Sequence, residues 1–175
     1  VDISTAIFII LNGFIYISYL FPYLKALGRA DTSVVVPLFQ IIPVFDYILA
    51  SIILGEVLSN IQIMASLMII FGAIGISIKL NGKKTKFRAD VVRLMLFACL
   101  LIAVNSVIFK FFALELDFWT TTFWENVGLG LFGLILMIFV KKYKRDFIYS
   151  FRKNGKKIIG LNALNEIISI IGIII

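Results

Sequence analysis

Residues 32–56 read TSVVVPLFQIIPVFDYILASIILGE, and this stretch decides the fold class of the chain. It is longer than the ~20 apolar residues that a helix needs to cross a bilayer at about 1.5 Å per residue. Pro37 and Pro43 lie inside it, and each removes a backbone donor. The carbonyl groups of Ser33 and Phe39, four residues earlier, are then left without a helical partner. Because a free carbonyl is costly in lipid, we expect other helices to enclose this span beside a polar cavity.

Asp46 lies near the middle of the same stretch, where a charged side chain costs roughly 2.5 to 3.5 kcal/mol on insertion scales. Such a group could carry a proton or hold a cation, and Pro43 then reads as a hinge or break. The alternative is structural, with Asp46 paired to Lys110 of a later helix or held protonated by hydrogen bonds. Gln40 lies six residues before Asp46, about 120° around a helix, so the two need not face one cavity.

Composition extends this interpretation to the whole chain. Its 175 residues are 61% hydrophobic and 15% charged, with a mean hydropathy of +1.06. Soluble domains have about 45–50% apolar and about 25% charged residues, so we expect an all-α, polytopic membrane protein. The sequence has no histidine, one cysteine (Cys99) and no nucleotide-binding or hydrolase motif, which argues against an enzyme, a metal site or a cofactor.

Six membrane-spanning helices are expected, at about residues 5–27, 32–56, 60–80, 91–114, 119–140 and from 158 onward. The connecting segments 28–31, 79–93 and 141–157, together with Lys25, hold 16 of the 17 basic residues. The net charge of +7 therefore indicates topology control with a cytoplasmic basic side, and not nucleic-acid binding. Aromatic residues between the charges of segment 141–157 predict a short amphipathic turn on the membrane surface.

Several polar residues inside the expected spans are candidates for a cavity lining. Asn12 and Tyr16 are four residues apart and share one helical stripe, where they could line a cavity or form ordinary interhelical hydrogen bonds. Asn105 lies deep in the fourth span, whereas Lys110 could reach water from its end or contact a substrate. Asn162 and Glu166 form a polar face in the last span.

The first part of the chain resembles the drug/metabolite transporter superfamily in its EamA-like branch, over about residues 16–78. The residues that carry the resemblance are Tyr23 to Leu27, Asp31 to Ser33, Pro43 to Phe45, Leu54 to Ser59 with Gln62, and Gly72 to Gly75. Pro43, Gly55 and Glu56 belong to this signature. The family has two inverted five-helix repeats, and the chain begins and ends within apolar runs. The resemblance thus implies a fragment similar to helices three to eight of ten.

On that register, residues 1–80 are the C-terminal part of the first repeat, 81–90 a basic linker and 91–175 the N-terminal part of the second. The resemblance implies a multi-pass transporter of the plasma membrane that moves a small metabolite or drug-like solute by alternating access, with proton coupling as an option. Lipid and a small-molecule substrate are the expected partners, and a homodimer is left open. The alternatives are a non-transporting scaffold or accessory subunit, or translocation of a lipid-linked sugar.

The expected route lies between the first, second, fourth and sixth spans. The residues assigned to it are Asn12, Tyr16, Gln40, Pro43, Asp46, Asn105, Lys110, Asn162 and Glu166.

Overall fold

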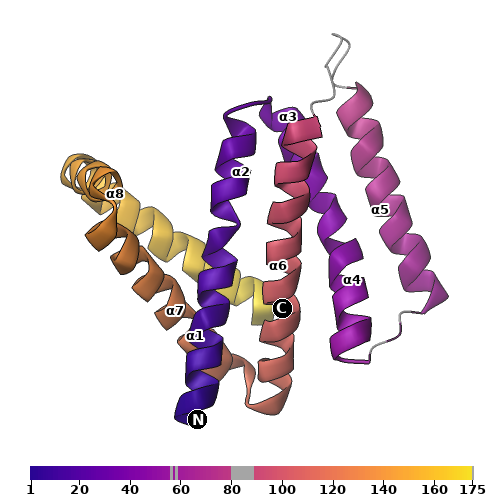
Figure 1. Cartoon of the computed structure of the whole chain (residues 1–175), viewed down its shortest axis with the longest axis horizontal. Helices are drawn as coiled ribbons and strands as arrows, with labels where there is room; N and C mark the ends of the chain where they lie inside the picture. The colour runs from indigo at the N-terminus through magenta and orange to yellow at the C-terminus, as the bar shows by residue number, and fades with distance from the viewer. Residues whose placement is uncertain (56, 58, 80–88, 175) are drawn as a thin grey trace. The chain divides into compact units, whose positions relative to one another are not determined.

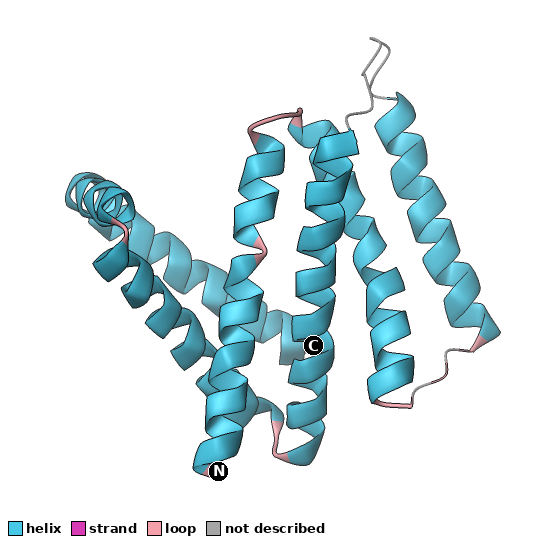
Figure 2. Cartoon of the chain, in the orientation of Figure 1, coloured by secondary structure: helices cyan, strands magenta, loops and turns pink. Residues whose placement is uncertain are grey.

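The computed structural model describes residues 1–55, 57, 59–79 and 89–174, and all regular secondary structure in them is helical (Figure 2). The elements are α1 (Ile3–Ser18), α2 (Leu20–Leu27), α3 (Thr32–Val35), the 3₁₀ helix η1 (Val36–Ile41), α4 (Ile42–Ile53), α5 (Asn60–Lys79), α6 (Ala89–Glu115), α7 (Phe118–Phe139) and α8 (Lys141–Ile174). Among the described residues, four segments are long and apolar enough to cross a membrane: Ile3–Leu27, Thr32–Ile53, Ala89–Glu115 and Phe118–Phe139. The predicted all-α membrane fold is confirmed.

The chain forms two compact units, Val1–Phe132 and Gly133–Ile175. The first unit contains residues from both sides of the predicted linker 81–90, because helices before and after it pack together. The assignment of 1–80 and 91–175 to two repeats concerns ancestry and not compactness, so it stays a prediction.

The first span is one helix with a break at Tyr19, between α1 and α2 (Figure 2). Pro22 has no N–H group to donate to the carbonyl of Ser18, four residues back, so the regular hydrogen-bond ladder is interrupted there. The Tyr19 N–H contacts the Tyr16 carbonyl at 3.4 Å, and the Tyr23 N–H donates to the Tyr19 carbonyl at 3.1 Å. The helix therefore resumes within one turn, and the segment still reaches membrane length.

The second span changes helix type where its prolines lie. The backbone between α3 and α4 tightens into the 3₁₀ helix η1, and the Ile42 N–H donates to the Phe39 carbonyl that Pro43 cannot serve. The neighbouring Leu38 carbonyl accepts from the Cys99 thiol of α6 at 3.4 Å. The expectation that other helices bury this span beside a polar cavity is wrong for α4, which has no fully buried residue. The reason is local: the tightened turn pairs the Phe39 carbonyl without help from other helices.

Helix α6 is the central element of the first unit, and it packs against α1, α2, η1 and α4 (Figure 1). Its fully buried residues are Val91, Met95, Ala98, Cys99, Ala103, Asn105 and Val107. Val91 and Met95 form a small core with Ala26 of α2 and Val35 of α3. A helix that buries residues along its length and is apolar on all sides belongs in the middle of a bundle.

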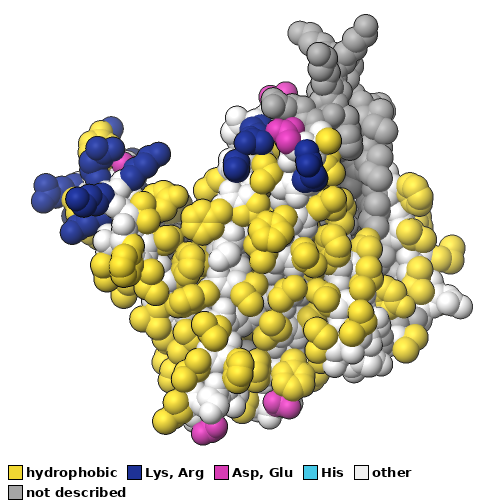
Figure 3. All heavy atoms as spheres, in the orientation of Figure 1, with side chains coloured by type: hydrophobic (Ala, Val, Ile, Leu, Met, Phe, Trp, Pro, Cys, Tyr) yellow, Lys and Arg dark blue, Asp and Glu magenta, His cyan; other side chains and the backbone are white. Residues whose placement is uncertain are grey.

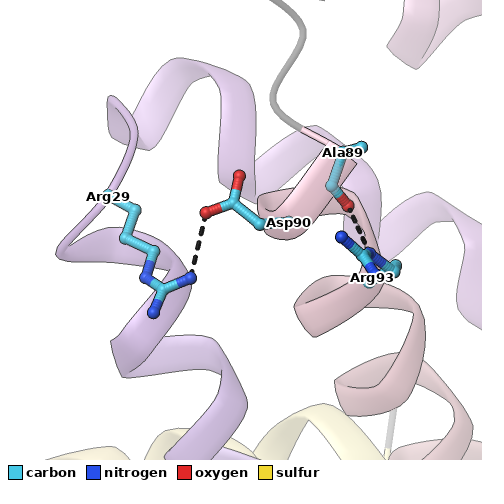
Figure 4. Close-up of polar contacts among 4 residues, drawn as sticks. All are labelled: Arg29, Ala89, Asp90 and Arg93. Carbon is cyan, nitrogen blue, oxygen red and sulfur yellow. Dashed lines mark hydrogen bonds and ion pairs between the residues drawn. The ribbon is translucent and has the colours of Figure 1, made fainter.

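Charges gather at the end of the first unit where α2 ends and α6 begins (Figure 3). Arg29 donates to Asp90 with an N–O distance of 2.9 Å, and Arg93 donates through Nε to the Ala89 carbonyl at 3.3 Å (Figure 4). The ion pair is partly exposed and contributes at most about 1 kcal/mol. It joins the end of the first span to the start of α6.

The turn after α4 contains a glycine in left-handed conformation and a capping pair of side chains. Gly55 has φ of +66°, the left-handed conformation that favours glycine at the end of a helix. The Ser59 N–H then donates to the Gln62 side-chain oxygen at 2.9 Å, and the Gln62 N–H contacts the Ser59 hydroxyl at 3.4 Å. Ser59 and Gln62 thus form a capping box at the start of α5.

In the second unit, the segment predicted to be a short amphipathic turn is the first half of α8. Within this helix Asn154 has a non-helical backbone, with φ of −135° and ψ of 20°. The apolar run from Ile158, predicted to be the last span, forms the second half of α8.

Candidate functional site: a polar cluster between three helices

Two glycines let α1 and α7 cross at backbone contact. A Cβ atom on Gly13 of α1 would lie 2.5 Å from the Glu125 carbonyl oxygen, and one on Gly128 of α7 would collide with the Ile10 carbonyl. Small residues at a crossing let membrane helices approach closely. Asn12 precedes Gly13, and Glu125 is three residues before Gly128, so the crossing brings these two polar side chains together.

The polar cluster consists of Asn12 of α1, Asn105 of α6 and Glu125 of α7. Both side-chain amides donate to the same carboxylate oxygen, Glu125 Oε1: Asn12 Nδ2 at 3.0 Å and Asn105 Nδ2 at 2.6 Å. Asn12 Nδ2 also contacts the Asn105 carbonyl at 3.2 Å, and Asn105 Nδ2 contacts the Asn12 carbonyl at 3.4 Å. The two asparagines thus bind each other's backbone and share one acceptor.

Burial makes these contacts energetically significant. Asn12 is 1% exposed, Asn105 is 7% exposed and Glu125 is half-buried. The described partners of the Glu125 carboxylate are both amides, which stabilise a negative charge without neutralising it. The Asn12 Oδ1 atom is buried without a hydrogen-bond donor. The cluster therefore offers acceptor oxygen atoms to a proton, a cation or a donor-bearing solute.

A second polar contact lies on another side of α6, between Asp46 of α4 and Ser106. Ser106 lies close enough to the Asp46 carboxylate to interact with it, and the Asp46 Oδ1 atom is buried without a hydrogen-bond partner. Since Ser106 follows Asn105 in sequence, the two side chains point about 100° apart around α6. The described partner of Asp46 is thus Ser106, whereas Lys110, which the sequence suggested, lies one turn further along α6.

The other residues predicted in the first unit lie outside these two contacts. Tyr16 is partly exposed and begins an aromatic row with Tyr19, their ring centroids 5.6 Å apart. Gln40 in η1, Pro43 in the first turn of α4, and Lys110 on α6 are exposed. The structure therefore brings together Asn12 and Asn105 from the predicted set, and not the whole set.

The remaining predicted residues are Asn162 and Glu166 in the second unit, and Gly55 and Glu56 after α4. Asn162 is exposed on α8, and for Glu166 only the backbone, within α8, is described. Gly55 takes its backbone role after α4, while Glu56 lies outside the described residues.

Glu125 is the site residue that sequence reasoning missed. It was visible as a carboxylate in the fifth span, three residues before a glycine. Its partners are 113 and 20 residues away in sequence, and no local pattern predicts such a meeting.

Comparison with known proteins bears on the first part of this site. Residues 2–78 match the EamA-like transporter family, whereas no curated protein and no solved structure matched the chain. The match covers α1 to α4 and most of α5, including Asn12 and Asp46, and it confirms the resemblance predicted from the signature residues. Asn105 and Glu125 lie beyond it. Over residues 2–78 the chain is therefore similar to a family of transporters.

Proposed function

We propose that the protein moves a small metabolite or drug-like solute across the plasma membrane by alternating access, coupled to proton movement. The observation that supports coupling is the carboxylate of Glu125, held by Asn12 and Asn105 between three membrane-spanning helices. Asp46, beside Ser106, is the second candidate for the same role. Membrane fractionation of cells expressing the full-length protein tests the location.

The geometry of the polar cluster suggests how a proton could alter helix packing. Both amides bind Oε1, so a proton on the other carboxylate oxygen would leave the hydrogen bonds possible but weaken them, because bonds to an ionised acceptor are about twice as strong. Protonation of Glu125 would therefore loosen the joint between α1, α6 and α7. Deprotonation would tighten it again, which is the two-state behaviour that a coupled carrier requires.

The decisive experiment uses the full-length protein in liposomes loaded with the pH indicator pyranine. Amino acids, nucleosides and small organic cations are added separately, and solute-dependent proton flux and solute counterflow are both measured. Glu125→Gln should abolish proton flux and keep counterflow, because the amide oxygen still accepts from both asparagines. Glu115→Gln, at the exposed end of α6, is the matched control and should leave both unchanged.

The Asp46→Asn variant distinguishes a coupling role of Asp46 from one of Glu125. Loss of proton flux only in Asp46→Asn would move the coupling role to Asp46, one of the two roles that the sequence left open for this residue. Unchanged flux across a range of pH in both variants would refute proton coupling. Wild-type protein that moves none of the solutes would favour the scaffold or accessory-subunit alternative.

A further inference from the structure

The first thirteen residues of α8, 141–153, place most of their basic residues and three of their aromatic rings on opposite faces, while Tyr149 lies among the basic residues and Lys144 at the edge of the aromatic face. Tyr143, Phe147 and Phe151 recur every four residues, so they fall within about 80° of the helix circumference and form the aromatic face. The rings of Phe147 and Phe151 stack with centroids 5.7 Å apart. All residues of this segment are exposed in the structure, so no described helix covers either face.

The opposite side of the same segment is strongly basic. The basic face consists of Lys141, Lys142, Arg145, Arg152 and Lys153, and lysine and arginine side chains gather over α8 (Figure 3). Part of it lines an open hollow along the helix. The one acidic residue of the segment, Asp146, lies 3.7 Å from Arg145, so the face keeps a large positive excess.

The backbone changes at the point where the composition changes. Asn154 leaves helical geometry immediately after the basic segment, and the apolar run begins at Ile158. A straight helix of 34 residues would be about 50 Å long, which exceeds the ~30 Å hydrocarbon core. The two halves of α8 therefore suit different environments, and the break at Asn154 lets them differ in direction.

We propose that residues 141–153 bind anionic phospholipid headgroups at the membrane–water interface, with the aromatic face at the acyl boundary. Charge complementarity identifies the occupant: a basic stripe opposite an aromatic stripe matches a negatively charged lipid surface. Arginine at two positions of the basic face suits phosphate, which it binds through two parallel hydrogen bonds. Topology control alone requires positive charge in the segment but no aromatic face opposite it.

The test places a spin label at Phe147→Cys in the full-length protein, in nanodiscs of phosphatidylcholine alone or mixed with phosphatidylglycerol. The background substitution Cys99→Ser keeps a donor for the Leu38 carbonyl. Power saturation with oxygen and a nickel chelate reports whether the label lies in lipid or water. We expect lipid contact in the anionic discs and a more aqueous position in phosphatidylcholine.

Charge variants then separate headgroup binding from simple insertion. Arg145→Gln combined with Arg152→Gln should shift the bound population toward water by about tenfold or more in anionic discs. The matched pair Arg145→Lys and Arg152→Lys keeps the charge and should keep most of the binding. A label that is aqueous in both lipids, or equally deep in both regardless of charge, would overturn the proposal.

Discussion

At the scale of single residues, Asn105 shows how many interhelical hydrogen bonds one residue can make in a membrane protein. Its Nδ2 group reaches a carboxylate on α7 and a backbone carbonyl on α1, while its own carbonyl accepts from Asn12. The side chain thus connects three helices at a depth where water cannot replace a lost partner. Asn105 therefore contributes to stability by donating hydrogen bonds to buried acceptors.

Replacement of Asn105 by alanine should lower the free energy of unfolding by about 0.5–2 kcal/mol, because interhelical hydrogen bonds in membranes are worth this much. The measurement is reversible denaturation in mixed micelles. Asn126→Ala is the matched control: its amide donates only to the Thr122 carbonyl within α7 and is exposed, so its effect should stay within about 0.5 kcal/mol. Equal losses in the two variants would show that the polar cluster does not stabilise the bundle.

Asp117 gives a pH-dependent prediction outside the membrane. Its carboxylate accepts from the Thr120 N–H at 2.8 Å at the start of α7, and hydrogen bonds from the Thr120 side chain and backbone lower the pKa of Asp117 below its ordinary 3.8. Since the folded pKa is the lower one, this stabilisation is present above the unfolded pKa and is lost as the pH falls through the folded pKa.

The thermal midpoint measured against pH should therefore drop at acidic pH, and part of that drop should vanish in Asp117→Asn. Asparagine can still cap the helix but does not titrate, whereas Asp117→Ala loses the cap at every pH. An acid transition identical in wild type and Asp117→Asn would contradict this assignment.

At the scale of elements, the crossing of α1 and α7 depends on the absence of side chains. Gly128→Ala would place a methyl group against the Ile10 carbonyl, and backbone cannot move aside as a flexible side chain can. We expect a loss of about 1–3 kcal/mol from the strain of overpacking. Wider separation would also weaken the bond from Asn12 to Glu125.

The same helix supplies the control for this prediction. Gly130→Ala adds a Cβ that meets no atom within 4 Å, so stability should be unchanged or slightly higher. Thermal unfolding of both variants in detergent measures the difference. A Gly130→Ala loss as large as that of Gly128→Ala would show that helix flexibility, and not the crossing, is what the glycines provide.

The elements also show what local sequence could predict. Pro43 indicated a break in the second span, because a missing backbone donor is a local property of the sequence. The 3₁₀ geometry was not predicted, since it depends on a hydrogen bond from the Ile42 N–H to the Phe39 carbonyl. The expectation that other helices bury this span came from assuming that this carbonyl stayed free.

At the scale of the whole molecule, membrane-spanning segments were predictable because length and apolarity alone define them. Residues 5–27 and 32–56 correspond to observed helical spans within a few residues, apart from the undescribed Glu56. The polar cluster was predictable only as unrelated parts: Asn12 and Asn105 were recognised as polar residues at depth. Their meeting with Glu125 depends on which helices are neighbours, and a single sequence does not encode that locally.

The backbone contact between α1 and α7 has a mechanical consequence for any carrier motion. Because α1 and α7 are in backbone contact at Gly13 and Gly128, neither helix can rotate or slide against the other unless they first separate. We therefore expect the two helices to move as one rigid body. Bending would then occur where the helical hydrogen bonding is already irregular. The 3₁₀ helix η1 of the second span is such a place. A rigid pair of helices, α1 and α7, next to a span that can bend at η1 is an arrangement suited to a rocking motion.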